Sequence, residues 1–312
     1  MYQQTIAAQI AFDGIGVHSG RPVSLVLVPA EADTGIVFRR RLDDGSVRDI
    51  EAVSANAPFG DLSTVIGSAD GVTIATIEHL MAALYAAGID NAIVEIDSGE
   101  TPIMDGCAAQ FMVAIDETGL VSQPVKRRYI RVLKTVSVEH NGARAEYRPH
   151  NTTRFEIEID FDCAAIGRQT YAGDLTAERF KGELSKARTF GFMKDVERLW
   201  AAGFALGSSL ENSVVIDVDG GIVNPDGLRY PDEFVRHKAL DAIGDQALAG
   251  ARILGCYASH RGGHRLNAMA LRALLEDRSA YEIVELPARR TDPVRHAPLV
   301  AVAAPAYGPQ ML

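Results

Sequence analysis

Hydrophobic and polar positions follow two periods along the chain, one typical of β-strands and the other of amphipathic helices. Alternating segments predict strands at 3–10, 22–28, 35–40, 92–97, 128–138, 143–148, 155–161, 213–216 and 252–258. Apolar residues at helical spacing predict helices at 76–87, 107–118, 176–186, 231–248 and 267–276. The stretch 41–72 has neither pattern and is expected to be rich in loops. Elements of both kinds in this order indicate the α+β class.

The order of the predicted elements is similar in two parts of the chain. Each part has a strand hairpin, a further strand, a helix that stops at a glycine (Gly88 or Gly250), a strand and a second helix. The polar segment 122–127 separates the two parts. We therefore predict a duplicated unit that forms two similar two-layer α/β-sandwich domains, 1–124 and 125–312, with the active site between them. From residue 288 on, Pro, Arg and Ala dominate, and we expect a loosely held tail.

The composition narrows the class of protein. A net charge of −10 over 312 residues argues against a nucleic-acid binder, which needs a basic face, but it allows a local basic pocket for an anionic small molecule. The three cysteines include no C-x-x-C pair, so neither a disulfide framework nor a cysteine zinc site is indicated. The first residues do not resemble a signal peptide, and no run of about 18 apolar residues occurs. We therefore expect a cytoplasmic protein without a transmembrane segment.

The predicted helix at 231–248 contains the first candidate chemistry. His237, Asp241 and Asp245 follow one another at intervals of four residues, which places them on one face of a helix. A histidine and a carboxylate on adjacent turns can bind a metal ion together. Taken alone, however, the stretch is more typical of a charged face in water, because ion pairs also gather carboxylates around histidines.

The predicted helix at 76–87 carries a second candidate pair. Glu78 and His79 lie in its first turn, after the expected N-cap Thr76, where the positive end of the helix favours an ionised Glu and an unprotonated His. Two histidines and one carboxylate are enough to hold a catalytic zinc with one open position. Glu78 could then take a proton from water, and His264, expected in a glycine-rich turn, could act as a second acid. Spacing alone does not show that the two halves converge.

Four segments of the chain closely match one protein family, in order. They are Thr-Ile-Glu-His-Leu at 76–80, Pro-Ile-Met-Asp-Gly at 102–106, Ala-Arg-Thr-Phe-Gly-Phe-Met at 187–193 and Phe-Val-Arg-His-Lys-Ala-Leu-Asp-Ala-Ile-Gly-Asp at 234–245. The chain thereby resembles the zinc-dependent UDP-3-O-acyl-N-acetylglucosamine deacetylases of lipid A biosynthesis. The resemblance runs from about Ile10 through Asn267, and the combination of the Glu-His pair with His-Lys-x-x-Asp-x-x-x-Asp is highly specific.

The resemblance implies roles for the candidate metal site. His79, His237 and Asp241 match the zinc ligands of the family, and Glu78 matches its general base. One Zn²⁺ per chain is therefore expected, with Fe²⁺ as the alternative in the cell.

The resemblance also implies roles around the reacting group. His264 matches the second catalytic histidine, and Asp245 matches the carboxylate that orients it and raises its pKa. Thr189 matches the hydroxyl that helps to bind the oxyanion.

A third set of residues is implied to bind the substrate. Lys238 and Arg261 match positions for the diphosphate, and the insert at 193–216 matches an apolar passage for the 3-O-acyl chain. Phe161 matches the contact with uracil, although core packing is the commoner role of a phenylalanine. The full set is Lys238, Arg261, Phe161, Phe190, Gly191, Phe192, Met193, Val196, Leu210, Val215 and His18.

The chain departs from the family at a few positions. Ser63 stands where several members have cysteine, so a thiol is not needed there. Ala143 replaces a basic residue, with Arg144 adjacent, and the segment 206–212 differs from the usual Gly-Gly-Ser pattern.

The implied activity is zinc-dependent hydrolysis of the N-acetyl group of UDP-3-O-acyl-N-acetylglucosamine, which releases acetate and commits the product to lipopolysaccharide synthesis. The expected partner is this small molecule, with no nucleic acid, and the chain is expected to be a monomer. Two alternatives stay open: another zinc amidohydrolase such as a peptidase, or a UDP-sugar- or lipid-binding module with a structural metal. A structural site is closed by four protein ligands, whereas here three candidates lie beside a Glu.

Overall fold

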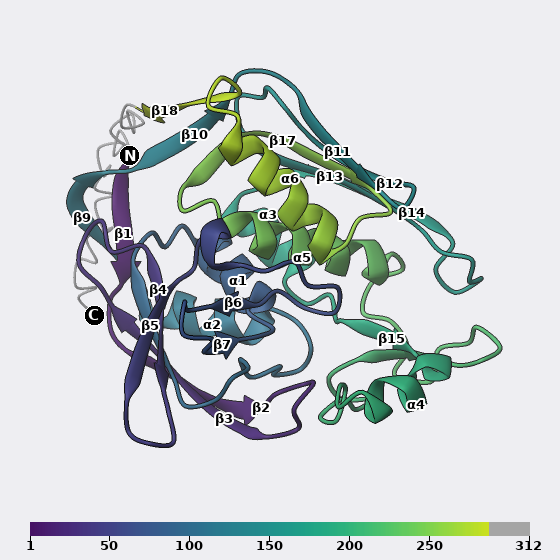
Figure 1. Ribbon diagram of the computed structural model, residues 1–312. Helices are drawn as coiled ribbons and strands as arrows, with labels where there is room; N and C mark the ends of the chain where they lie inside the picture. The colour runs from purple at the N-terminus through teal and green to yellow at the C-terminus, as the bar shows by residue number, and fades with distance from the viewer. Residues whose placement is uncertain (287–312) are drawn as a thin grey trace, which may run out of the picture.

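The computed structural model of the chain describes residues 1–286 (Figure 1). It combines helices with two main β-sheets, which confirms the predicted α+β class. The prediction of a loose tail from residue 288 on lies outside the described residues.

The first main sheet has five strands in the order β2-β3-β8-β4-β5. Their bounds are β2 Ile10–Ile15, β3 Pro22–Pro29, β4 Ile36–Arg41, β5 Val47–Glu51 and β8 Ala92–Ile96. Alternate side chains of β3 (Val23, Leu25 and Leu27) are buried, as the alternating pattern predicts. The helices of this half are α1 (Glu78–Ala87), in which every residue but the last is buried, and α2 (Ala109–Thr118).

The second main sheet has seven strands. Their bounds are β10 Arg128–Val132, β11 Val136–His140, β12 Ala143–Arg148, β13 Thr153–Asp160, β14 Arg168–Asp174, β17 Arg252–His260 and β18 Tyr281–Glu285. Helices α5 (Glu233–Ala247) and α6 (His264–Glu276) cover one face of this sheet, as Figure 1 shows. The other face carries alternating charged side chains.

The two sheets share one strand order. In the first, the order β2-β3-β8-β4-β5 places the last strand of the unit between its hairpin and its third strand. The second repeats this order as β11-β12-β17 followed by β13 and β14, with the same parallel pair at the centre (β8 with β4, β17 with β13). Strands β10 and β18 extend the second sheet. This topology confirms the predicted duplication, whereas the domain boundary after residue 124 stays a prediction.

Most of the polar segment 122–127, where the boundary between the two parts was predicted, is a strand. It belongs to β9 (Leu120–Lys126), which pairs with β1 (Tyr2–Ile6) in a separate two-stranded sheet. This strand was not predicted, because its polar residue Gln123 is buried: the amide bonds both Asn91 and the carbonyl of Ala30. The strand predicted at 3–10 likewise ends at Ile6, and a new strand begins at Ile10.

Several other element boundaries differ from the prediction. The strand predicted at 128–138 is divided between β10 and β11, and the helix predicted at 176–186 has a first turn, α3 (Ala177–Arg179), followed by a π-helical segment (Phe180–Leu184). Within the region expected to be loops lie β5 and two short elements, a 3₁₀ turn (Ser54–Asn56) and β6 (Ile66–Gly67), which pairs with β7 (Thr73–Ile74). Strands β14 and β18 were not predicted.

The insert projects from the second half, at the lower right of Figure 1. It comprises β15 (Phe190–Phe192), α4 (Met193–Ala201) and β16 (Val214–Ile216), and its two strands pair in parallel. Within residues 1–286, no helix is both long and apolar enough to cross a membrane.

Helices α1 and α5 pack against each other between the two halves. Their closest approach is at Gly244 of α5, where an added Cβ atom would lie 2.0 Å from the carbonyl oxygen of Glu78. Only glycine fits at such a distance, so this residue determines how closely the two helices approach. The contact places the first turn of α1 beside the C-terminal part of α5.

Candidate active site

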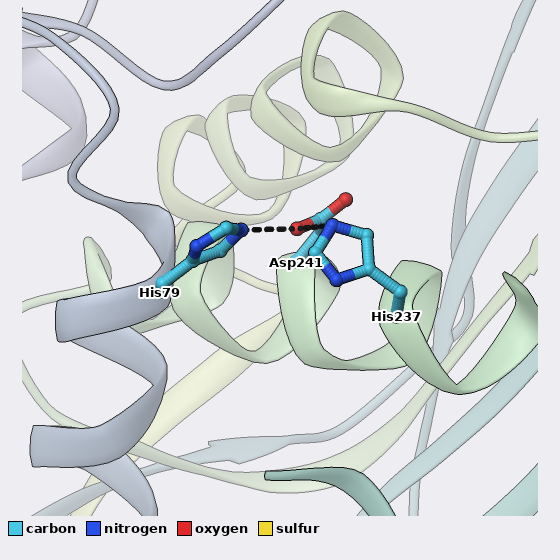
Figure 2. Close-up of side chains that lie close together, drawn as sticks. All are labelled: His79, His237 and Asp241. Carbon is cyan, nitrogen blue, oxygen red and sulfur yellow. Dashed lines mark ion pairs between the residues drawn. The ribbon is translucent and has the colours of Figure 1, made fainter. Parts of the chain in front are cut away.

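Three side chains that the sequence places in different halves converge at the contact between α1 and α5. His79 and His237 direct their Nε2 atoms to Oδ1 of Asp241, at 3.6 and 3.2 Å (Figure 2). All three residues are buried, and one ligand atom from each lies within 4.8 Å of the others. The two imidazole rings meet edge to face, 5.0 Å apart. Residue spacing alone did not show whether the two helices bring these side chains together, and the structure shows that they do.

The donor set fits a divalent metal ion. Oδ1 of Asp241 is buried without a hydrogen-bond partner, although two imidazole nitrogens point toward it. Burial lowers the pKa of His237 to about 4 despite the adjacent carboxylate, so its ring is neutral. The pKa of Asp241, which burial alone would raise, is held well below its usual value by His237 and Lys238. Two imidazoles and one carboxylate, with an unpartnered oxygen at the centre, form a typical site for zinc or a similar ion.

The backbone determines the tautomer of His237. Its Nδ1 atom lies 3.0 Å from the carbonyl oxygen of Ala187. Because a carbonyl only accepts hydrogen bonds, Nδ1 carries the proton and Nε2 keeps its lone pair free for a metal ion.

Glu78 is buried beside this group. Its Oε2 atom accepts a hydrogen bond of 3.0 Å from the backbone N–H of Thr64, and its Oε1 atom lies 3.9 Å from Nε2 of His264. Burial raises the pKa of Glu78, although His264 and His79 oppose the shift. A carboxylate with a raised pKa is a stronger base than an exposed one, which suits a general base.

His264 faces the candidate metal ligands from the other side. Its Nδ1 atom lies 3.0 Å from Oδ2 of Asp245, and its Nε2 atom lies 3.9 Å from Oδ2 of Asp241. Burial lowers the pKa of His264, but attraction and hydrogen bonding to Asp245, with a contribution from Glu78, raise it to about 9. The imidazole is therefore protonated at neutral pH, and its Nε2–H points into the site.

The expected turn around His264 is instead the start of a helix. His264 is the first residue of α6, and Gly263 before it is extended rather than left-handed. Position 264 is helical because Asn267 donates its backbone N–H to the carbonyl of Gly263, which closes the first helical turn. Thr76 also differs from its prediction, since Ile77 occupies the N-cap position and the Thr76 hydroxyl bonds Glu100.

Two residues that support His264 were missed by the sequence analysis. The Thr64 hydroxyl donates to Oδ1 of Asp245 and lies 3.2 Å from Nδ1 of His264. The Asn267 amide donates to Oδ2 of Asp245 at 2.7 Å. Asn267 follows His264 by three residues on one helix, and this spacing could have indicated it. Thr64 lies in a region without periodicity, where no sequence signal points to it.

Lys238 lies at the edge of the group. Its Nζ atom is 2.8 Å from Oδ2 of Asp241, and the carboxylate raises the pKa of this lysine against the effect of burial. The side chain therefore pairs with the candidate metal ligand and at the same time borders the cavity described next.

An apolar cavity of about 530 Å³ leads from these residues to the insert. It is lined by most of the predicted site residues: Glu78, His79, His237, Asp241, His264, Thr189, Lys238, Phe161, Phe190, Gly191, Phe192, Met193, Val196, Leu210, Val215 and His18. Leu199 and Trp200 of α4 also line it and were not predicted. Their spacing with Val196 on α4 could have indicated them.

Two predicted residues do not line the cavity. Asp245 lies behind His264, where an orienting carboxylate would be expected. Arg261 is exposed in the turn between β17 and α6, with a left-handed backbone (φ 56°). A second cavity of about 480 Å³, beside Tyr85 and Arg252, contains none of the predicted site residues.

Comparisons with known proteins agree with this geometry. The family model of UDP-3-O-acyl N-acetylglycosamine deacetylase (LpxC) matches residues 3–276. A Brucella ovis protein named UDP-3-O-acyl-N-acetylglucosamine deacetylase is 56% identical over 287 residues, which cover 91% of this chain and 99% of that protein. A protein of the same name from Brucella melitensis biotype 2 is 55% identical over 287 residues, with the same shares covered.

Proposed function

Because the chain belongs to the family of UDP-3-O-acyl-N-acetylglucosamine deacetylases, we propose that it hydrolyses the N-acetyl group of UDP-3-O-acyl-N-acetylglucosamine and releases acetate. In lipid A biosynthesis this reaction exposes the free amine of the sugar. The observation that carries the proposal is the group His79, His237 and Asp241, with Glu78 and His264 on either side, at one end of an apolar cavity.

The three converging side chains would hold the metal. We propose zinc, with ferrous iron as the alternative in the cell, since imidazole and carboxylate ligands suit both ions. A bound zinc ion polarises a carbonyl oxygen and lowers the pKa of a coordinated water to roughly 7. The chain contributes two imidazoles, one carboxylate and the apolar wall of the cavity.

Glu78 acts as the general base in this proposal. Burial raises its pKa, so its carboxylate is a stronger base than an exposed glutamate and accepts the proton of the attacking water. The hydrogen bond from the Thr64 N–H to Oε2 keeps the side chain oriented and leaves Oε1 facing His264.

His264 acts as the acid. Its pKa of about 9 keeps the imidazole protonated at neutral pH, and Asp245 holds the ring through Nδ1, so that Nε2–H faces the reacting group. This proton stabilises the negative charge of the tetrahedral intermediate and then passes to the leaving amine. The Thr189 hydroxyl, which borders the same cavity, is proposed to assist in binding the oxyanion.

The cavity accounts for the two unlike ends of the substrate. The apolar side chains of the insert would receive the 3-O-acyl chain, while Lys238 and the exposed Arg261 would lie toward the diphosphate. Phe161 packs edge to face against Phe190, 5.8 Å away, at the cavity wall, and is proposed to contact uracil. We further propose that the protein acts as a monomer in the cytoplasm.

The experiment is acetate release from UDP-3-O-acyl-N-acetylglucosamine of varied chain length by the metal-loaded protein. UDP-N-acetylglucosamine without the acyl chain is the matched control. We expect turnover of the acylated substrates only, with inhibition by a small hydroxamate that needs an open metal position. Metal binding without acetate release, and without hydroxamate binding, would instead indicate a closed structural site.

A further inference from the structure

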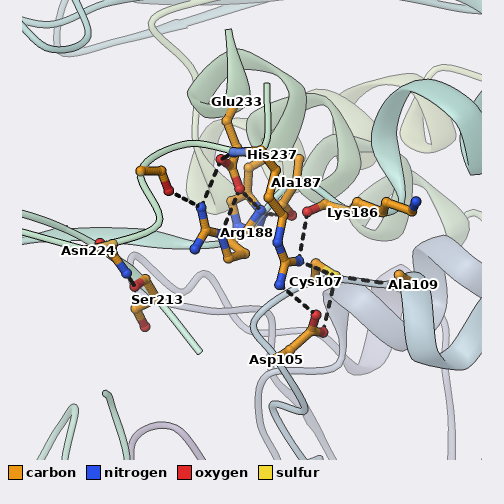
Figure 3. Close-up of polar contacts among 12 residues, drawn as sticks. Asp105, Cys107, Ala109, Lys186, Ala187, Arg188, Ser213, Asn224, Glu233 and His237 are labelled. Atoms are coloured by element: carbon orange, nitrogen blue, oxygen red, sulfur yellow. Dashed lines mark hydrogen bonds and ion pairs between the residues drawn. The ribbon is translucent and has the colours of Figure 1, made fainter. Parts of the chain in front are cut away.

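A second polar group lies behind the candidate metal ligands, and nothing in the proposed reaction uses it. At its centre is Glu233, the first residue of α5, whose side chain is fully buried (Figure 3). Arg188 donates to it three times, from its backbone N–H and Nε to Oε1 (both 2.9 Å) and from Nη2 to Oε2 (3.1 Å). The backbone N–H of Arg229 donates to Oε2 at 2.6 Å. Four donors therefore hold one carboxylate out of contact with water.

The segment held by Glu233 also contacts a candidate metal ligand. Arg188 follows directly after Ala187, whose carbonyl oxygen accepts the hydrogen bond from Nδ1 of His237, as Figure 3 shows. Glu233 and His237 are four residues apart on α5 and so share one face of the helix. The contacts thus form a closed ring, from Glu233 through Arg188 and Ala187 to His237 and back along one turn of α5.

The same segment is tied to the first half of the chain. The backbone N–H of Thr189 donates to the carbonyl of Gly106 at 2.8 Å. The Arg229 guanidinium lies 2.9 Å from Oδ2 of Asp105 and donates to the carbonyl of Lys186 at 3.0 Å. The contacts on both sides of Ala187 therefore connect the half that carries Glu78 with the half that carries His237.

A purely structural ion pair does not require this arrangement. An Arg–Glu pair that only stabilised the fold could lie anywhere, and buried pairs are weak contributors to net stability. Here the backbone N–H of Arg188, as well as its guanidinium, is bonded to the carboxylate, so that the peptide after Ala187 cannot rotate freely. A carbonyl held in this way gives the histidine one ring orientation and one tautomer.

We infer that Glu233 and Arg188 are positioning residues, which hold the Ala187 carbonyl and the Thr189 hydroxyl in place for the His237 imidazole and for the reacting group. The inference rests on the proposed function of the site for its catalytic part only. The rest of the inference, which concerns metal affinity and the tautomer of His237, holds for any metal that this site binds.

The test compares Glu233→Gln and Arg188→Lys with a matched control, Glu282→Gln. Glu282 pairs with Arg131 at 3.0 Å on the surface, and neither residue lines the cavity of the site, so its variant removes one Arg–Glu pair without touching the site. Zinc affinity is measured by chelator competition on metal-free protein, and the visible spectrum of the Co²⁺ form reports ligand geometry.

We expect Glu233→Gln to weaken zinc binding by roughly 10–100-fold and to change the Co²⁺ spectrum, as is typical when a group that orients a metal ligand is altered. Arg188→Lys should give a smaller effect of the same kind, because the two backbone N–H donors to Glu233 remain and the lysine keeps a positive charge. In both, kcat should fall more than KM rises. Folded variants with zinc affinity, Co²⁺ spectrum and kcat all within about twofold of the control would overturn the inference.

The wild-type protein gives a further measurement that does not depend on whether the variants fold. In metal-free protein, ¹⁵N NMR of the His237 ring should show the proton on Nδ1, whereas a proton on Nε2 would contradict the inference. If wild-type protein releases no acetate, the proposed function fails, but the zinc affinity and the tautomer still decide whether Glu233 positions His237.

Discussion

Charged side chains gather in two regions of the molecule that differ in their access to water. In the candidate active site, where α1 and α5 pack together, Glu78, Asp241, Asp245 and His264 are all buried. On the outer face of the seven-stranded sheet, arginines and carboxylates of β12, β13 and β14 form a ladder of exposed or half-exposed ion pairs. The pairs are Arg144–Glu146, Arg148–Glu146, Arg148–Glu156, Arg154–Glu156, Arg154–Asp174 and Arg168–Glu158.

The two regions differ in how much each charged group contributes to the stability of the fold. Exposed ion pairs contribute about 0–1 kcal/mol, because water screens them and long side chains lose freedom on pairing. A buried charge cannot be left unpaired without a large cost, so each buried group depends strongly on its neighbours. The charged ladder therefore keeps one face of the sheet hydrated, whereas each buried group of the active site depends on its neighbours for its stability.

The largest effect is expected from Glu78→Gln in the cleft. The amide keeps the shape and can still accept the Thr64 hydrogen bond, but it cannot take a proton, so kcat should fall by roughly 10²–10⁴-fold. Metal content should stay at the wild-type level, as should the activity of the ladder variant Glu158→Gln. The measurements are acetate release and metal analysis. A folded Glu78→Gln protein with more than about a tenth of wild-type kcat would contradict the assignment of the base.

The next effect is expected on metal binding. Asp241→Asn removes the charge of the only carboxylate among the three converging side chains. Zinc affinity should fall by more than the roughly 10–100-fold seen when a residue one step removed from a metal is changed. Chelator competition measures this, with Asp174→Asn on the sheet ladder as the control. Unchanged affinity in Asp241→Asn would show that the ion binds elsewhere.

A smaller effect is expected on the pKa of His264. In metal-free protein this pKa is about 9, above the ordinary value of 6.5, since Asp245 outweighs the effect of burial. The ion pair therefore stabilises the fold in full below about pH 6.5, and this contribution is lost as the pH rises through about 9. In Asp245→Asn, NMR titration should show a clearly lower His264 pKa, and the stability difference from wild type should shrink above pH 9. A His264 pKa that stays near 9 in the variant would show that Asp245 does not raise it.

The smallest effect is expected on the ladder itself. Glu156→Gln removes a carboxylate that pairs with Arg148 and Arg154 on the outer face of the sheet. Denaturant unfolding should show a loss of less than about 1 kcal/mol, and kcat should not change. A loss of several kcal/mol would mean that the ladder is coupled to the core, and the contrast between the two regions would then be wrong.

The sequence predicts helices α1 and α5 well, but it does not predict that they pack against each other. The four-residue spacing of His237, Asp241 and Asp245 correctly places them on one helix face, and the Glu-His pair lies at the start of α1 as expected. That α1 and α5 touch depends on contacts between residues far apart in the chain, which no local period encodes. The prediction reached this convergence through the family resemblance.

The misses have local physical causes. Strand β9 was missed because its polar residue Gln123 is buried by bonding to Asn91, and burial of a polar side chain cannot be read from composition. The start of α6 was placed too late, because Gly262 and Gly263 precede it and glycines suggest a turn. Thr64 was missed because its part in the site depends on a loop that folds back on α5 and α6.

The close contact at Gly244 has a consequence for how the molecule unfolds. The backbones of α1 and α5 touch there without a side chain between them, and one continuous apolar cluster runs from Ile6 in the first half to Tyr281 in the second. Neither half can open while the other stays closed without exposing the inner helix of its partner. The amides of α1 and α5 should therefore exchange their hydrogens together, in a single cooperative opening event, although the two halves repeat one strand order.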